Sequence, residues 1–183
     1  MSSIWMLIYR AKTSLRPAVS DLVDKAITFA TKAHGDQKRK YTEESYITHP
    51  IAVMEIVKTV PHTDEMLAAA VLHDVIEDTD QSYDDIYYYF GETVADLVLG
   101  LTDVSHTDDG NRQFRKALDR QHLAEQGADV QTIKLADMIH NTLTTKDHDP
   151  AFWKIYQKEK IALLEVLTKG SKMLHAKAIE MLS

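Results

Sequence analysis

The chain has 183 residues, enough for one domain with a sizeable core but too few for two comfortable ones. Its formal net charge of −7 argues against non-specific nucleic-acid binding, which depends on Lys and Arg side chains that neutralise phosphates. Cysteine is absent, which excludes disulfides and thiolate metal sites, so imidazole and carboxylate groups must bind any metal. The few glycines and prolines leave little material for β-turns and favour helices.

The N-terminal region holds one apolar stretch, at residues 4–9. It is too short for a signal sequence or a membrane span, and no small-residue cleavage site follows it. We therefore expect a cytoplasmic protein with no membrane partner. Apolar side chains at helical spacing then predict an amphipathic helix over residues 17–34, which Gly35 ends from the C-cap position.

Residues 36–45 are polar and show no helical period, which predicts a loop. Arg39 and Lys40 make this loop basic. Pro50 suits the first turn of a new helix, so we expect His49 at or beside the N-cap of that helix. Positive charge for an anionic ligand would thus lie next to a histidine.

Residues 66–72 are apolar almost all round, which predicts a helix deep in the fold. His73 and Asp74 continue directly from this run. Helical spacing would pair His73 with Glu77 and Asp74 with Asp78. Polar groups gathered at the end of a buried helix need partners.

The rest of the chain predicts further helices separated by short polar segments. They are expected at about residues 82–91, 94–101, 114–127 and 130–141, and from 149 to about 170, before a short final helix. No repeat or linker interrupts the series. We therefore expect an all-α fold in which residues 1–183 form a single compact domain of about seven to eight helices.

The adjacent His73 and Asp74 allow two interpretations. In the first, they belong to a frayed helix end whose acids face water. In the second, an imidazole and a carboxylate bind one cation, and the acids one turn later reach its bound water. Two ligands do not make a site, so this needs a further histidine and carboxylate. His49 and Asp137 are the candidates, although an acid on an amphipathic helix can instead form a salt bridge.

Four segments of the chain, in order and with similar spacing, resemble the hydrolase domain of the RelA/SpoT family. They are AHGDQKRK at residues 33–40, YITHP at 46–50, LHDVIEDT at 72–79 and LAD at 135–137. The similarity extends over about residues 26–141. The chain is most similar to the small stand-alone hydrolases of that family, because its length leaves no room for a synthetase domain.

This resemblance implies an HD-domain helical bundle that removes pyrophosphate from the 3′ position of guanosine 3′,5′-bis(diphosphate) (ppGpp), usually with Mn²⁺. By motif, the metal ligands fall on His49, His73, Asp74 and Asp137. The acids that activate or steer the attacking water fall on Glu77 and Asp78. Expected substrate contacts are Asn141, together with the basic side chains of Arg39 and Lys40.

Several alternatives stay open. Close relatives carry a tyrosine that lines the nucleoside pocket, but this chain has Ile161 there, with Tyr156 as the nearest substitute. The substrate could thus be an adenine alarmone or another phosphorylated nucleoside. A non-catalytic nucleotide sensor is a further interpretation, which the complete ligand set and the Glu77-Asp78 pair oppose. The imidazoles would also accept Zn²⁺, Fe²⁺ or Co²⁺. The expected partner is a small nucleotide and no nucleic acid, and the sequence leaves the oligomeric state undetermined.

Overall fold

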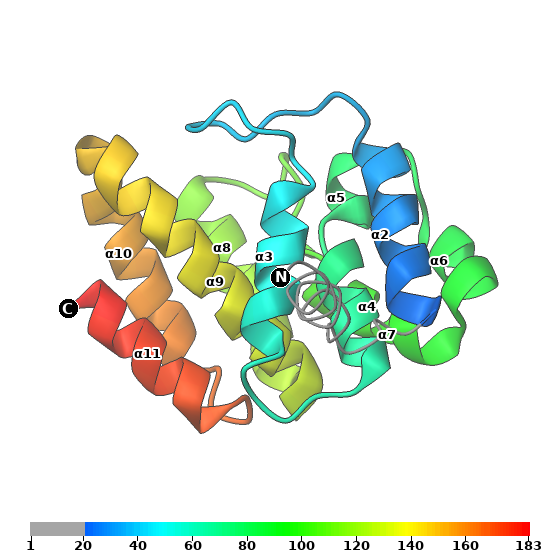
Figure 1. Cartoon of the computed structure of the whole chain (residues 1–183). Coiled ribbons are helices and arrows are strands. Elements are labelled where there is room, and N and C mark those ends of the chain that lie inside the picture. Colours follow the sequence, from blue (N-terminus) through cyan, green and yellow to red (C-terminus); the bar gives the residue numbers. More distant parts are fainter. Residues whose placement is uncertain (1–20) are drawn as a thin grey trace, which may run out of the picture.

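The computed structural model describes residues 21–183 (Figure 1). Its helices are α2 (Asp21–His34), α3 (Thr48–Val57), α4 (Asp64–Leu72), α5 (Val75–Asp78), α6 (Tyr83–Phe90), α7 (Glu92–Leu101), α8 (Arg112–Glu125), α9 (Ala128–His148), α10 (Pro150–Leu164) and α11 (Lys172–Leu182). This confirms the all-α prediction, with a few more helices than expected because short segments such as α5 form separate turns. The apolar stretch at residues 4–9 and the predicted helix start at Pro17 lie outside the described residues.

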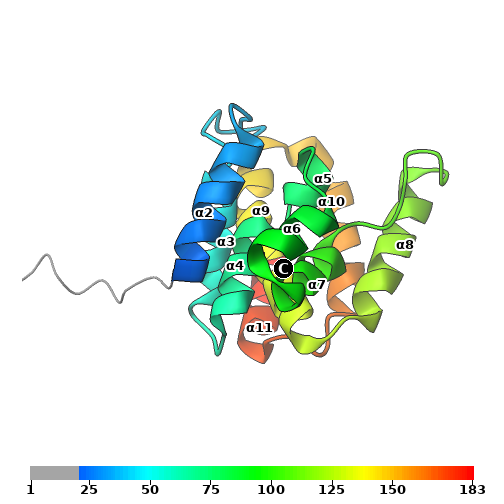
Figure 2. The same ribbon diagram turned by 90° about the vertical axis from the view of Figure 1, so that its right-hand side faces the viewer.

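Three helices form the centre of the bundle. The long helix α9 packs against α3 and α4, and these two also pack against each other. Helices α2, α6 and α7 lie on one side of this centre, and α10 and α11 cover the other side of α9 (Figure 1). The view turned by 90° shows α8 standing beside α10 (Figure 2). Among residues 21–183, no helix is both long and apolar enough to cross a lipid bilayer.

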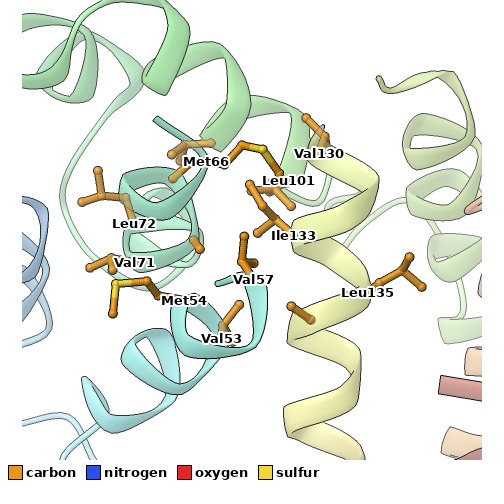
Figure 3. Close-up of a cluster of buried hydrophobic side chains, with 14 of the residues drawn as sticks. Val53, Met54, Val57, Met66, Val71, Leu72, Leu101, Val130, Ile133 and Leu135 are labelled. Carbon is orange, nitrogen blue, oxygen red and sulfur yellow. The ribbon is translucent and has the colours of Figure 1, made fainter. Parts of the chain in front are cut away.

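The core lies between α3, α4, α7 and α9. Val57, Leu101 and Ile133 meet where α3, α7 and α9 converge (Figure 3). Helix α4 is buried along its whole apolar run, from Met66 to Leu72, as its sequence predicts. The small alanines in this run allow neighbouring helices to approach closely on several faces. This packing holds the C-terminal end of α4, and the residues that follow it, in a fixed position.

The basic loop between α2 and α3 arches over one end of the bundle (Figure 1). It begins at Gly35, whose φ of 51° is the left-handed conformation of a helix C-cap and favours glycine. A single antiparallel bridge joins Lys38 to Ser45. At its tip, Tyr41 donates a hydrogen bond of 3.1 Å to Asp149. The loop is thus tied to the junction between α9 and α10.

Helix α3 starts slightly earlier than the sequence suggests. Its N-cap is Ile47, so His49 lies inside the first turn rather than at or beside the cap. The backbone N–H groups of Thr48 and His49 bond to the preceding turn, and Pro50 needs no such partner because it has no N–H. His49 is therefore held by helical backbone and is buried.

The helix break at His73 and Asp74 departs from the predicted continuous helix. His73 Nδ1 donates to the carbonyl oxygen of Ala70 at 2.8 Å. In an unbroken helix this oxygen would accept from the backbone N–H of Asp74. Asp74 instead adopts φ −96° and ψ −3°, and α5 begins one residue later. The break turns both side chains toward the centre of the molecule.

Helix α10 begins as predicted, with Asp149 as N-cap and Pro150 in the first turn. It ends at Leu164 rather than near residue 170. The segment after it closes onto α9, where the backbone N–H of Lys169 donates to the side chain of Gln131 at 2.8 Å. Gly170 packs so closely on Gln131 that an added Cβ would lie 3.0 Å from its backbone carbon. This close approach requires the chain to leave the helix.

Candidate metal centre and catalytic cavity

The four predicted ligands converge from different helices. His73 Nε2 lies 3.0 Å from Asp74 Oδ2 and 3.8 Å from Asp137 Oδ1. His49 Nε2 lies 3.5 Å and 3.3 Å from the same two oxygen atoms. One ligand atom each from His49, His73 and Asp74 lies within 4.8 Å of the others, a spacing that could hold a metal ion. Segments that are distant in sequence thus bring imidazole and carboxylate groups to one point.

The two imidazole rings have the orientation that a metal site requires. His73 Nδ1 bonds to Ala70, which directs Nε2 toward the carboxylates, and this buried Nε2 has no hydrogen-bond partner of acceptable geometry within residues 21–183. An unpartnered buried nitrogen is costly unless a ligand takes it up. His49 Nδ1 lies 2.8 Å from His140 Nδ1. Both Nε2 atoms therefore point toward the carboxylates, and the donor set fits a divalent cation.

Neighbouring side chains fix the two carboxylates. Tyr46 donates a hydrogen bond of 2.6 Å to Asp74 Oδ2. On α9, Asn141 donates at 2.6 Å to Asp137 Oδ1, and Lys134 Nζ lies 3.3 Å from Asp137 Oδ2. Such supporting contacts orient metal-binding carboxylates and preserve their charge. The prediction that Asp137 and Asn141 share one helix face is confirmed.

The electrostatics of the cluster favour a positive charge at its centre. Burial alone would raise the pKa of Asp137, but Lys134 and the two imidazoles hold that pKa well below its usual range. Burial would likewise lower the pKa of His73, yet Asp74 and Asp137 raise it to about 10. The carboxylates thus create a field that stabilises a proton on His73. A divalent cation would satisfy the same field and displace that proton.

A cavity of about 320 Å³ opens beside this cluster. It is lined by Arg39, Tyr46, His49, Asp74, Glu77, Asp78, Asp103, Lys116, Asp119, Arg120, Leu123, Lys134, Asp137, Asn141, Glu159, Lys160 and Leu163. Carboxylates outnumber cationic side chains on these walls, so a bound divalent cation would bring the cavity closer to neutrality.

Glu77 and Asp78 lie on α5, at the wall of this cavity. Glu77 Oε1 accepts a hydrogen bond of 2.6 Å from the backbone N–H of Asp103. The surrounding walls displace water and raise the pKa of Glu77 to about 7. Desolvation and the nearby Asp74 also raise the pKa of Asp78. Glu77 can thus exchange a proton near neutral pH, and the raised pKa makes Asp78 a better proton acceptor than an exposed aspartate.

The expected substrate contacts are only partly brought together. Arg39 lines the cavity and donates a hydrogen bond of 2.9 Å to Asn141 Oδ1. Lys40 is exposed and is not among the lining residues, and its Nζ lies over the ring of Tyr41. Of the two basic loop residues, only Arg39 lines the cavity beside the cluster.

Neither candidate for the nucleoside pocket reaches the cavity. Tyr156 is buried, and its hydroxyl lies 3.2 Å from the hydroxyl of Thr142. Ile161 lines a separate apolar pocket between α10 and α11. Lys160 and Leu163 of α10 line the cavity in their place.

Five residues at or beside the site were given no role from the sequence. Tyr46 lies inside a matched segment and Lys134 directly precedes one, so their positions could have drawn attention to them. A search for metal ligands alone passes over both, because neither is a histidine or a carboxylate. His140 is next to Asn141, but its bond to His49 joins residues 91 positions apart. Arg120 and Lys160 lie outside every matched segment, and only the fold brings them to the cavity.

The chain is similar in sequence to nucleotide hydrolases. A Synechocystis protein named probable guanosine-3′,5′-bis(diphosphate) 3′-pyrophosphohydrolase is 38% identical over 126 residues, which cover 67% of this chain and 16% of that protein. The chain thus spans a small part of this long relative. A Drosophila melanogaster protein named guanosine-3′,5′-bis(diphosphate) 3′-pyrophosphohydrolase MESH1 is 36% identical over 132 residues, covering 70% of this chain and 72% of that protein.

The fold is also shared with a solved structure described as a metazoan ortholog of SpoT that hydrolyzes ppGpp. The two superpose with a TM-score of 0.79 at 30% identity, covering 88% of this chain and 94% of that one. The family model of the HD domain matches residues 26–163. The chain therefore belongs to the HD-domain family and, within it, to the RelA/SpoT-type hydrolases.

Proposed function

We propose that this protein hydrolyses the 3′-pyrophosphate of ppGpp and releases GDP and pyrophosphate. The observation that carries the proposal is the convergence of His49, His73, Asp74 and Asp137 beside the acidic pair of α5, in one cavity. The Drosophila protein is named for this reaction, and the solved structure is described as hydrolysing ppGpp. The alignment with this chain covers most of the length of each. Similarity of both sequence and fold supports the same substrate class.

The proposed metal ligands are His49, His73, Asp74 and Asp137, and the proposed ion is Mn²⁺. Two imidazoles and two carboxylates leave coordination positions open for water and a phosphate oxygen. A divalent cation bound there acidifies a water molecule and offsets negative charge on the phosphorus. The mixed nitrogen and oxygen donors suit Mn²⁺ and are also compatible with Zn²⁺, Fe²⁺ or Co²⁺.

The proposed proton acceptors are the two acids of α5. With a pKa of about 7, Glu77 can take a proton from the attacking water near neutral pH. Its hydrogen bond from Asp103 fixes the direction of the carboxylate. Asp78 is separated from Asp74 by one helical turn and can orient the same water. These residues act on the water without being required as ligands.

The proposed reaction breaks the bond between the ribose 3′ oxygen and phosphorus. The water oxygen attacks that phosphorus and loses a proton, the ribose 3′ oxygen leaves and takes up a proton to give GDP, and the pyrophosphoryl group is released intact as pyrophosphate. Arg39 would hold the nucleoside through its planar guanidinium, with the exposed Lys40 next to it on the loop and Asn141 beside the metal ligands. Because Arg39 and Asn141 are bonded to each other, the nucleoside and the cluster are held in one geometry.

The test is incubation of the purified protein with 3′-phosphorylated nucleotides, with and without Mn²⁺, followed by separation of the products. We expect metal-dependent release of pyrophosphate from ppGpp. The panel should include adenine counterparts, because neither Tyr156 nor Ile161 lines the cavity. Preferential hydrolysis of an adenine alarmone would change the substrate, and absence of turnover with tight binding would favour a nucleotide sensor.

The setting proposed for this activity is a single domain over residues 1–183 that acts in the cytoplasm. Its proposed partner is the nucleotide substrate, with no nucleic acid involved. The net charge of −7 supports this view, because a small anion can be bound by local cations while a long polyanion is repelled.

A further inference from the structure

Two cationic side chains on the α8–α10 side of the cavity form no ion pair with a carboxylate. Arg120 comes from α8 and Lys160 from α10. Neither forms an ion pair or a side-chain hydrogen bond with any residue in the described range 21–183. By contrast, Lys116 and Lys134 on the same walls are paired with carboxylates.

The nearby acids are already engaged. Glu159, which precedes Lys160 on α10, forms two hydrogen bonds of 2.7 Å and 2.9 Å with Arg112. Asp119, which precedes Arg120 on α8, accepts from Lys116 and from Ser105. Arg120 and Lys160 are therefore available to bind an anionic ligand.

The surroundings of Lys160 make its free charge costly. Its Nζ lies over the Tyr156 ring, 5.1 Å from the ring centre, and this cation–π contact offsets only part of the cost. Burial, together with the charge of Lys134, lowers the pKa of Lys160 to about 8. An ammonium group in such a place is stabilised by an anionic partner, so the wall is suited to binding one.

Positive charge continues outward from this wall. A groove of about 630 Å³ between α8 and α10 shares Lys116, Arg120 and Glu159 with the cavity. Its outer part adds Lys154 and Lys158. These lysines form no ion pair within residues 21–183, so the groove offers an anion a path of positive potential into the cavity.

We infer that Arg120 and Lys160 bind the 5′-phosphates of the nucleotide and so select substrates that are phosphorylated at both ends. This inference rests on the proposed function, which puts the 3′-pyrophosphate at the cluster of His49 and His73. The nucleotide's other charged group then needs cations elsewhere in the same cavity. Arg39 is assigned to the nucleoside, and the α8–α10 wall supplies the two other cavity cations that form no ion pair within residues 21–183.

The test compares three substrates that share a 3′-pyrophosphate and carry a 5′-diphosphate, a 5′-monophosphate or a 5′-hydroxyl group. For the 5′-diphosphate, Lys160→Met should raise KM by about 10- to 100-fold and leave kcat within a few-fold, because a charged hydrogen bond is lost. For the 5′-hydroxyl substrate, the same variant should leave KM unchanged. Lys160→Arg keeps the charge and should restore most of the affinity.

Two matched variants complete the design. Arg120→Gln should show the same dependence on the 5′ group, which keeps the inference testable if Lys160→Met fails to fold. Lys177→Met removes an exposed lysine of α11 and should change neither parameter. An equal rise in KM for all three substrates, or no rise for any, would overturn the role of the wall. Failure of the wild-type protein to release pyrophosphate from every substrate would instead reject the proposed function.

Discussion

His49 and His140 face each other through their Nδ1 atoms at 2.8 Å, so one of the two nitrogens must carry the proton. Burial and the neighbouring His49 lower the pKa of His140 to about 4, which keeps His140 neutral and able to accept. If His49 donates this proton, its Nε2 presents a lone pair toward Asp74 and Asp137. His140 would then set the tautomer of a metal ligand.

Removing His140 should weaken metal binding without removing a ligand. We expect His140→Ala to lower the affinity for Mn²⁺ by about 10- to 100-fold, the usual range for lost outer contacts to a metal site. Titration with Mn²⁺ measures this directly. His148→Ala, which alters an exposed histidine at the end of the same helix, is the matched control. Equal affinities in the two variants would show that His140 does not orient His49.

Asp74→Asn should reduce metal content and activity together, because a neutral amide is a poorer ligand than a carboxylate. The melting temperature measured with saturating Mn²⁺ should also rise less than in the wild-type protein, since bound metal stabilises the folded state by linkage. Metal analysis, kinetics and thermal melts are the measurements. Full metal occupancy with full activity would remove Asp74 from the ligand set.

Glu77→Gln should separate catalysis from metal binding. A carboxylate that takes a proton from water is lost, so turnover should fall by about two to four orders of magnitude. Metal content should stay near that of the wild-type protein, because the ligands are other residues. If the variant loses its metal, Glu77 must instead be reassigned to the coordination sphere.

Arg39→Ala should chiefly weaken substrate binding. The change removes a charge from the cavity and the hydrogen bond of 2.9 Å to Asn141. We expect KM to rise by about tenfold or more while metal content is unchanged. Lys40→Ala alters an exposed neighbour outside the cavity lining and should have a smaller effect. A KM equal to that of the wild-type protein would put Arg39 outside the substrate site.

The charge of Lys160 predicts a pH dependence. With its pKa lowered to about 8, this side chain is cationic below that pH and neutral above it. The charged groups that face it are Lys134, Asp137, Lys116 and Asp103. The value of kcat/KM for ppGpp should therefore fall as the pH rises through about 8. Lys160→Arg should lose this step, because arginine stays charged, and a step that persists in this variant would belong to another group.

Local sequence was sufficient to predict most of the helices and which residues gather in the cluster. Thr63 and Ser82 cap α4 and α6 through their own side chains, and such local bonds can be recognised in a sequence. The spacing of Asp137 and Asn141 also follows from helical geometry alone. These features depend on residues that are close together in the chain.

Other features depend on contacts between distant segments. The break after α4 forms because the His73 side chain takes the carbonyl of Ala70, a competition that helical periodicity does not reveal. Lys160 reaches the cavity only because α10 folds back beside α8, and nothing in its local sequence distinguishes it from the exposed Lys158. Such residues need the tertiary structure before a role can be assigned.

The most direct test of the central claim is hydrolysis of ppGpp in water labelled with ¹⁸O, in the presence of Mn²⁺, followed by mass spectrometry of the products. Attack at the phosphorus of the 3′ group predicts that the label appears in pyrophosphate and that GDP carries none. Label in the nucleoside product, release of orthophosphate or cleavage at the 5′ end would contradict the proposed reaction.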